Sequence, residues 1–510
     1  MLAFDKKNEL YAELMLAEIN ATRLQVSKTT KKQTKSDLGQ FFTDPRLALF
    51  MSKLFEIDEP HVKLLDPGAG IGVLTTATIT QLCKKGKKPG SIQVTAVEID
   101  SKLINHLKHA LEFCKQLCSF NNIQFSYSIV QEDFIDYGVN QLLKSTDEII
   151  NKVIMNPPYK KINSKSSERL TLRRIGIETT NLYAGFVAIA KKMLADGGEL
   201  VAITPRSFCN GTYFRPFRED FLNDMSFRNI HLFDSRKDAF KDDEVLQENI
   251  IFHAVKGKKL EQVTISSSTG LEAEIVSHKL QYNELVHPND MDKFIRILKN
   301  DDDIKIKKLM GKITTSLNDL GLSVSTGKVV DFRTLENLRD QPEDGAVPLI
   351  YPVHFNNGYL RWPVSPAEKP NAIKVNESTE KQLLCQGNYV LVKRFSPKEE
   401  KRRIVPAIYD SSNFETEFIG FENHTNYYHH NGHGIPLVLA KGLALYLSST
   451  IVDLFFRQFN GHTQVNVGDL KSLPYPTYEQ LVKLGASMRE EFPSQEIIDR
   501  LVSSIINISV

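Results

Sequence analysis

Four consecutive residues, Asn156-Pro157-Pro158-Tyr159, combine groups that suit one kind of chemistry. They follow the apolar run 153–155, which predicts a short buried strand. The Asn side-chain carbonyl and the backbone carbonyl between the prolines can accept both hydrogens of an exocyclic amine, because proline fixes φ and adds no N–H. This draws the amine nitrogen of a base such as adenine toward a nucleophilic geometry. The Tyr ring adds a face for stacking, so the tetrapeptide indicates a site that activates a nucleobase amine.

A glycine-rich turn precedes this stretch in the chain. Asp66 ends an apolar run, and Gly68, Gly70 and Gly72 follow it before an expected helix over residues 73–85. Glycines let the backbone approach a ligand closely at the first strand–helix turn of a nucleotide-binding sheet. The spacing is Gly-x-Gly-x-Gly, which differs from the dinucleotide pattern Gly-x-Gly-x-x-Gly.

Acidic residues follow the next two expected strands. Glu98 stands at the tip of the second strand, where an acid suits a ribose diol, although alone it could be a surface acid. Asp133-Phe134 follow the third strand, where an acid can pair with an adenine amine beside an aromatic cover. Asp100 is expected to cap the following helix rather than to touch a ligand. The order of these motifs, each at a strand end with helix-length gaps, predicts a doubly wound α/β sheet.

Together these motifs resemble those of the amino-group DNA methyltransferases that use S-adenosylmethionine. The similarity is to the class whose cofactor motifs precede the catalytic motif, typified by adenine-N6 enzymes of type II restriction–modification systems. Residues 38–45, which contain Phe42-Thr43, resemble the family's N-terminal motif. The resemblance covers residues 38 to about 255. It implies a Rossmann-like doubly wound methyltransferase domain followed by a mixed α+β target-recognition domain.

The resemblance also implies residue roles. The cofactor site for S-adenosylmethionine would comprise Phe42, Thr43, Asp66, Gly68, Gly70, Glu98, Asp133, Phe134 and Asn156. The catalytic residues that bind the target base would be Asn156, Pro157, Pro158 and Tyr159. Phe252 lies where the family often places an aromatic against the flipped base, although Phe240 could take that role and Phe252 could simply pack in the core.

The net charge is only +2, so a DNA enzyme with this sequence must concentrate its positive charge locally. One basic cluster follows the tetrapeptide, one lies in the second half, and one lies near the N-terminus. They are Lys160, Lys161, Lys165, Arg169, Arg173 and Arg174; Lys393, Arg394, Lys398, Lys401, Arg402 and Arg403; and Lys28, Lys31, Lys32 and Lys35. We favour DNA contact for the first cluster and a solvated face for the third. Lys393 and Arg394 are candidates from the second.

Length and composition set the organisation. The 510 residues, with 41% hydrophobic and 25% charged side chains, suggest a soluble protein of two or three domains. We expect an N-terminal helical arm and linker over 1–37, a catalytic domain over 38–258 and a target-recognition domain over 259–510. The apolar stretch 435–456 contains charges and predicts a buried helix rather than a membrane span.

Metal and disulfide chemistry are not expected. The five cysteines form no Cys-x-x-Cys pair, which favours a reduced cytoplasm. His429, His430 and His433 have no Cys or acidic ligand close by in the sequence, so we interpret them as loop histidines.

We therefore expect a site-specific DNA methyltransferase of the bacterial cytoplasm or nucleoid that methylates N6 of a flipped-out adenine in double-stranded DNA. A separate cognate restriction endonuclease would be a natural partner, and no fused nuclease, membrane or metal is expected. Cytosine-N4 methylation uses the same amine chemistry and stays open. Methylation of an RNA or protein amine stays open too, as does a catalytically inactive DNA-specificity subunit.

Overall fold

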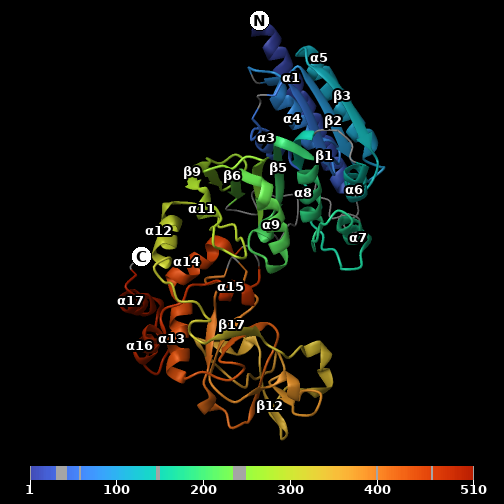
Figure 1. Ribbon diagram of the computed structural model, residues 1–510. Coiled ribbons are helices and arrows are strands. Elements are labelled where there is room, and N and C mark those ends of the chain that lie inside the picture. Colours follow the sequence, from blue (N-terminus) through green and yellow to red (C-terminus); the bar gives the residue numbers. More distant parts are fainter. Residues whose placement is uncertain are drawn as a thin grey trace. The chain divides into compact units, whose positions relative to one another are not determined.

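The chain forms two compact units, Met1–Lys299 and Asn300–Val510 (Figure 1). The computed structural model describes residues 2–29, 43–56, 59–84, 86–144, 150–233, 248–397, 400–460 and 463–508.

The first unit is built on a nine-stranded sheet with the order β3-β2-β1-β4-β5-β7-β6-β8-β9. The strands are β1 (His61–Pro67), β2 (Ser91–Val97), β3 (Gln124–Val130), β4 (Ile150–Met155), β5 (Leu194–Pro205), β6 (Met225–Phe233), β7 (Asn249–Lys256), β8 (Gln262–Ser268) and β9 (Val276–Gln281). Strands β3, β2, β1, β4 and β5 are parallel neighbours, and β7 runs antiparallel between β5 and β6. The predicted doubly wound α/β fold is confirmed.

Helices cover both faces of this sheet. They are α1 (Leu2–Thr29), α3 (Pro45–Ser52), α4 (Val73–Lys84), α5 (Ile104–Phe120), α6 (Phe134–Lys144), α7 (Ser167–Arg173), α8 (Leu182–Met193), α9 (Arg215–Asp224) and α11 (Tyr282–Leu285), with short 3-10 turns η1 (Arg206–Cys209) and η2 (Thr212–Phe214). Ile251 of β7 joins the cluster formed by α1, α3, α4 and α5, whereas its neighbour Phe252 packs on Phe221 of α9. Because successive strand residues point to opposite faces, these two helix groups lie on opposite sides of the sheet.

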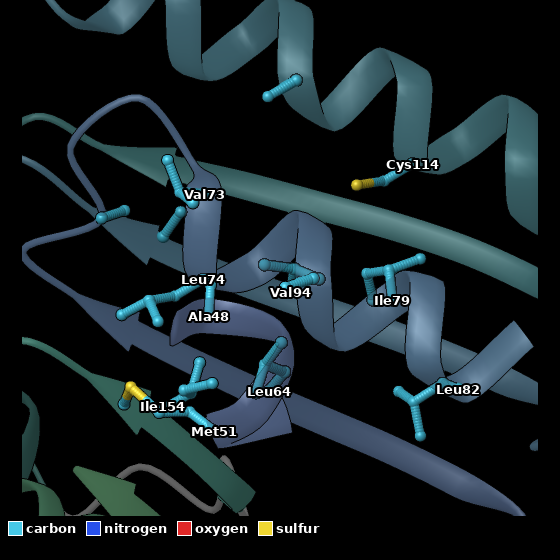
Figure 2. Packing of buried hydrophobic residues seen from close by; sticks show 14 of the residues in the cluster. Ala48, Met51, Leu64, Val73, Leu74, Ile79, Leu82, Val94, Cys114 and Ile154 are labelled. Atoms are coloured by element: carbon cyan, nitrogen blue, oxygen red, sulfur yellow. The ribbon is translucent and has the colours of Figure 1, made fainter. Parts of the chain in front are cut away.

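One apolar core joins the first helix group to the strands. Figure 2 shows Ala48 and Met51 of α3 and Leu74 of α4 close to Leu64 of β1 and Ile154 of β4. Each of these five side chains is at most 4% exposed. This packing fixes α3 and α4 over the strands whose ends carry the candidate site.

The first unit extends further in both directions than the catalytic domain expected over 38–258. At the N-terminus, Ala12, Met15 and Ile19 of α1 are buried in the same core, so the expected arm is part of the unit. At the other end, β8 pairs with β6 and β9 with β8, so the sheet continues beyond residue 258. The edge strands, together with contacts such as that of the Ile295 N–H with the Cys209 carbonyl oxygen, keep the residues after 258 with the first unit, which ends at Lys299.

The second unit mixes short strands and helices, in agreement with the expected α+β class. Its strands are β10 (Ser323–Thr326), β11 (Leu338–Arg339), β12 (Ala346–Ile350), β13 (Phe355–Asn356), β14 (Tyr359–Leu360), β15 (Ala372–Lys374), β16 (Leu384–Cys385), β17 (Tyr389–Lys393), β18 (Pro406–Tyr409), β19 (Phe418–Phe421) and β20 (Thr425–His429). They form sheets in the orders β10-β20-β17-β18, β11-β15-β12-β19-β16 and β13-β14. Its helices are α12 (Asp301–Met310), α13 (Leu437–Leu447), α14 (Thr450–Phe459), α15 (Val467–Lys471), α16 (Tyr478–Ala486) and α17 (Gln495–Ile506).

The apolar stretch 435–456, predicted as one buried helix, is two helices. Helices α13 and α14 are bent by 62° at the break between them. Helix α13 crosses α16 closely, because a Cβ on Gly442 would lie 1.8 Å from the Leu481 carbonyl oxygen and one on Gly485 would lie 1.8 Å from that of Val438. In the described residues no single helix is long and apolar enough to cross a membrane, and only the bent α13–α14 pair meets that criterion jointly.

A buried charged group links three central strands of the first unit. Lys152 of β4 forms an ion pair with Glu199 of β5, and His253 of β7 lies 3.1 Å from the same carboxylate through Nε2. Asn229 lies 3.2 Å from His253 Nδ1, which leaves Nε2 to donate to Glu199. Burial pushes the pKa of Glu199 upward, but the His253 hydrogen bond and the Lys152 charge hold that pKa at about 2.

We predict that Glu199→Gln will lower the free energy of unfolding at pH 7 by about 3 kcal/mol, because the buried Lys152 would keep only the more distant Glu59 carboxylate, at 3.9 Å, as an acidic partner. The folded-state pKa of Glu199 is depressed, so its contribution is complete above the ordinary value of 4.5 and is lost as pH falls toward about 2. Urea unfolding at pH 7 and pH 3 should show the wild-type advantage shrinking at the lower pH. Glu496→Gln, in an exposed pair, should cost less than about 0.5 kcal/mol. An equal Glu199→Gln penalty at both pH values would contradict this assignment.

Candidate active site

The motif residues meet at one edge of the first sheet. In the register of the parallel strands, Pro67 at the end of β1 pairs with Val97 of β2, and Val97 pairs with Val130 of β3. Strand β4 is parallel to β1 on its other side. Because parallel strands end at the same edge, the segments that follow all four strands lie together.

The turn after β1 owes its shape to glycine. Gly68, Gly70 and Gly72 have φ angles of +76°, +58° and +87°, which side-chain-bearing residues rarely adopt. The Gly68 N–H donates to the Val97 carbonyl oxygen at 2.8 Å and anchors the turn to β2. A Cβ on Gly72 would lie 3.1 Å from Leu107 of α5, whereas one on Gly70 would meet nothing within 4 Å. Gly72 therefore allows helix packing, and Gly70 faces open space.

Asp66 is a buried acid with an unsatisfied oxygen. Its side chain is fully buried, and Oδ2 accepts a hydrogen bond from the Thr75 hydroxyl at 2.6 Å. Oδ1 is buried without a hydrogen-bond partner. Burial raises the pKa of Asp66 to about 7. Buried polar atoms without partners are rare, so Oδ1 of Asp66 is a candidate acceptor for a ligand group.

Glu98 is held by backbone donors. Its Oε2 accepts from the Gly70 N–H at 2.7 Å, and its Oε1 accepts from the Asp100 N–H at 2.8 Å. Burial raises the pKa of Glu98, although these hydrogen bonds oppose that rise. Glu98 thus couples the glycine turn to the end of β2. The expectation that Asp100 caps the following helix is wrong: α5 begins at Ile104 with Leu103 as its N-cap, and Asp100 instead accepts from the Lys102 N–H at 3.0 Å in the turn before it.

Asp133 and Phe134 lie where β3 leads into α6. Asp133 Oδ1 accepts from the Ile135 N–H at 2.7 Å at the start of that helix. The Phe134 ring packs against Phe186 of α8, with ring centroids 4.9 Å apart. Phe186 is also the nearest neighbour of a Cβ built on Gly68, at 3.7 Å. The third motif is thereby packed beside the first.

The tetrapeptide after β4 is fixed by hydrogen bonds from two sides. Asn156 Nδ2 donates to the Thr43 hydroxyl at 3.1 Å. The Tyr159 hydroxyl lies 3.0 Å from Asn156 Oδ1 and 3.1 Å from the Ile203 carbonyl oxygen of β5. Two successive prolines supply no N–H, so the strand ladder cannot continue past Asn156. The Asn156 amide is therefore clamped between the segment before α3 and the end of β5.

Sequence reasoning missed part of this clamp. It gave Tyr159 a stacking role only, yet the hydroxyl also contacts the Asn156 amide. It also missed Thr75, which hydrogen-bonds Asp66, and Tyr183, whose ring lies edge-on to that of Tyr159 at 6.2 Å. No local pattern marks these residues, because their roles depend on tertiary packing.

The hydrogen-bond acceptors at this edge match the hydrogen-bond donors of S-adenosylmethionine. That molecule carries an ammonium group, a ribose diol and an adenine amine, all of which donate hydrogen bonds to acids. The acceptors available are the unpartnered Oδ1 of Asp66 and the carboxylates of Glu98 and Asp133. The open space at Gly70 leaves room beside them. Thr43 is 8% exposed and contacts Asn156, whereas Phe42 lies outside the described residues.

The basic residues after the tetrapeptide are partly neutralised. Arg173 donates to Glu178 at 2.7 Å, and Arg169 forms an ion pair with the same carboxylate. Lys161 and Arg174 are exposed. Lys160 is exposed as well and has other interactions. This surface keeps a net positive charge next to Tyr159.

Phe252 lies in the core of the structure rather than at the site edge. Its side chain is 1% exposed, and its ring contacts those of Phe208, Phe221 and Phe227. This position corresponds to plain core packing, because even-numbered residues of β7 face the α9 side of the sheet. Phe240 lies outside the described residues.

The second basic cluster is largely engaged within the second unit. Lys393 donates to Glu400 at 2.8 Å, and Arg394 donates to the Asn423 carbonyl oxygen at 3.1 Å. Arg403 is 1% exposed and donates to Asn460 Oδ1 at 2.6 Å, so it is a core residue and not a DNA contact.

Of the histidines interpreted as loop residues, His429 is the last residue of β20, and His430 pairs with His433 in an isolated bridge. His429 Nδ1 accepts from the Gly432 N–H at 2.9 Å, and its Nε2 lies 2.9 Å from the Ser325 hydroxyl. In the part of the chain that the structure describes, no group of three or more His, Cys, Asp or Glu side chains is arranged to hold a metal ion.

Comparison with known proteins agrees with the family resemblance of the sequence motifs. Residues 46–240 match the family model of the Eco57I restriction-modification methylase. The chain is 43% identical to the type II methyltransferase M.PstI of Providencia stuartii, over 96% of this chain and 97% of the relative. It is also 43% identical to the type II methyltransferase M.BsuBI of Bacillus subtilis, over 97% and 98% of the two chains.

A solved structure agrees at the level of the fold. The type IIL restriction-modification enzyme MmeI, solved in complex with DNA, aligns with a TM-score of 0.54 and 11% identity. The alignment covers 98% of this chain and 75% of that one.

We predict that Gly70→Ala will weaken S-adenosylmethionine binding at least about tenfold, because the added Cβ would occupy the space left for the ligand. Gly345→Ala is a matched control, since Gly345 has a φ of +75° and a Cβ there also meets nothing within 4 Å. Both variants should lose about 1 kcal/mol of stability from the left-handed backbone. Calorimetric titration and thermal unfolding provide the two readouts, and equal ligand affinity in the two variants would contradict the assigned site.

Proposed function

The chain belongs to the type II methyltransferases of restriction–modification systems, and we propose that it methylates N6 of adenine in double-stranded DNA. The observation that carries this proposal is the clamped Asn156 amide beside the acidic cofactor set at one sheet edge. S-adenosylmethionine is the methyl donor and supplies an electrophilic methyl group next to the target amine.

Asn156 and Pro157 would act on the amine of an adenine that has left the helix. A carbonyl oxygen has two lone pairs, so Asn156 Oδ1 can accept an amine hydrogen as well as the Tyr159 hydroxyl. The Pro157 carbonyl would accept the second hydrogen. When both amine hydrogens are held by these acceptors, the nitrogen lone pair is directed at the methyl group to be transferred. The residues therefore act by positioning and electrostatics.

Tyr159 would serve the base in two ways. Its ring offers a face for stacking, and its hydroxyl holds the Asn156 amide in the orientation that catalysis needs. The Tyr183 ring supports it edge-on, at 85° between ring planes. Stacking and hydrogen bonds to the extruded base offset the cost of a few kcal/mol of taking it out of the duplex.

Positive charge next to Tyr159 would hold the DNA backbone. We assign phosphate contacts to Lys160, Lys161 and Arg174, with Arg173 shared with Glu178. We assign recognition of the DNA base sequence to the C-terminal part expected over 259–510. Most of this part forms the compact unit Asn300–Val510. Lys393 and Arg394 stay candidates for contacts there, since neither is fully buried.

The biological setting follows from the family. A modification enzyme protects host DNA against a restriction endonuclease of the same specificity, so we propose a separate cognate endonuclease as a partner. Cytosine-N4 methylation is the second candidate, because the amine of cytosine offers the same two hydrogens to Asn156 and Pro157.

We predict that Asn156→Ala will reduce methyl transfer by at least about a thousandfold, because it removes an acceptor that acts at the reacting nitrogen. S-adenosylmethionine affinity should change less than about threefold. Mass spectrometry of nucleosides from DNA incubated with labelled donor measures transfer and identifies the base. N6-methyladenine supports the proposal, whereas N4-methylcytosine would move it to the second candidate. Equal loss of donor binding and transfer would contradict the role of Asn156.

We expect Tyr159→Phe and Tyr159→Ala to separate the two functions of Tyr159. The Phe variant keeps the stacking face and loses the hydroxyl contacts with Asn156 and Ile203, so the single-turnover rate should fall about five- to tenfold. The Ala variant loses both and should fall about a hundredfold or more. A wild-type rate in Tyr159→Phe would show that the hydroxyl contact does not orient Asn156.

A further inference from the structure

Two large apolar side chains stand out on the surface of the first unit. Tyr213 of η2 is 79% exposed and Met291 is 73% exposed, the highest values for large hydrophobic side chains among the described residues. Single exposed apolar residues are ordinary on protein surfaces, so exposure alone decides nothing. Tyr213 and Met291 differ from other exposed apolar residues because the segments that carry them share one anchor.

A buried arginine holds the segments that carry both residues. Arg218 of α9 is fully buried, and its Nη1 donates to the Phe208 and Gly211 carbonyl oxygens at 3.0 and 2.8 Å. Its Nε donates to the Asp292 carbonyl oxygen at 2.9 Å. The backbone at residues 208, 211 and 292 is therefore fixed to one guanidinium group. Because the backbone near the exposed ring is held in place, binding needs to order mainly the side chain.

The same segment is packed against the candidate catalytic tyrosine. Phe214, which follows Tyr213, stacks on Tyr183 with centroids 5.6 Å apart. Tyr183 lies edge-on to Tyr159, and its hydroxyl is 2.8 Å from that of Ser207. Two ring contacts thus connect the residue next to Tyr213 with the residue that would stack on the target base.

The backbone of Lys160 and Lys161 borders this aromatic path. The Leu182 N–H at the start of α8 donates to the Lys160 carbonyl oxygen at 2.9 Å, and Lys161 bridges to Asn181. The residues assigned to phosphate contact are therefore attached to the helix turn that carries Tyr183. An exposed aromatic side chain on the same unit as these lysines suits stacked bases within a polyanion.

We propose that Tyr213, with Met291 beside the same anchor, is the wedge that enters the DNA helix where the target adenine has left it. This inference rests on the proposed function and adds the residue that replaces the extruded base. A ring stacked in the gap recovers part of the stacking lost on extrusion, and apolar wedges of this kind are known to support unstacked base steps.

The test uses the full-length enzyme and unmethylated duplex oligonucleotides that contain the motif that the wild-type enzyme methylates. Tyr213→Ala should slow single-turnover transfer about tenfold and reduce the fluorescence rise of 2-aminopurine placed at the target position. Tyr213→Phe should stay within about twofold of wild type, because the ring is kept. Leu143→Ala, which alters a half-exposed apolar side chain of α6, is the matched control and should change neither readout.

Two further readouts separate a wedge from a structural role. S-adenosylmethionine affinity should be unchanged in Tyr213→Ala, and its transfer defect should shrink below about threefold when the target adenine is mispaired and already leaves the helix readily. A Tyr213→Ala rate within twofold of wild type on paired duplex would overturn the inference, as would a Tyr213→Phe defect equal to that of Tyr213→Ala. Wild-type enzyme that transfers no methyl group to DNA would instead overturn the proposed function.

Discussion

The register of the parallel strands β3-β2-β1-β4 is the constraint on which the site depends. Pro67, Val97 and Val130 lie in line across three strands, so the residues that follow them emerge at one edge although long stretches of sequence separate them. Side chains alternate between sheet faces, so a slip of one residue in β1 would turn Asp66 away from its partner Thr75. The apolar core around α3 and α4 fixes this register by matching helix side chains to alternate strand residues.

Polar contacts then convert this edge into a rigid site. Thr43 and Tyr159 hold the Asn156 amide from two sides, while Glu98 holds the glycine turn through the Gly70 N–H. Lys152 and Glu199 tie β4 to β5 further back in the sheet, which braces the two strands whose ends carry the amide clamp. The acids at the edge are buried, and burial raises the pKa of Asp66 and Glu98. A cationic or hydroxyl-bearing ligand would therefore replace water that these groups have lost.

Motif order in the sequence was sufficient to predict the fold class, the family and the strand ends of the first unit. Glycine turns and a Pro-Pro pair have local physical causes, and those survive in the sequence as patterns. The extent of the units was not accessible in this way, because the packing of α1 and the pairing of β8 with β6 depend on distant partners. Charge patterns were the least informative. Arg403 lies in a basic cluster of the sequence but is a buried donor to Asn460, and Arg218 carries no sequence signal for its anchoring role.

The most direct test of the central claim, that this edge methylates an adenine amine in DNA, is long-read sequencing of DNA from a methylation-deficient host that expresses the chain. The account predicts N6-methyladenine at one recurring motif, with the signal absent from cells that express Asn156→Ala. Modified cytosine at a motif would keep the amine chemistry and contradict the choice of base. Unmodified DNA from cells that hold folded, donor-binding protein would contradict DNA as the substrate of this site.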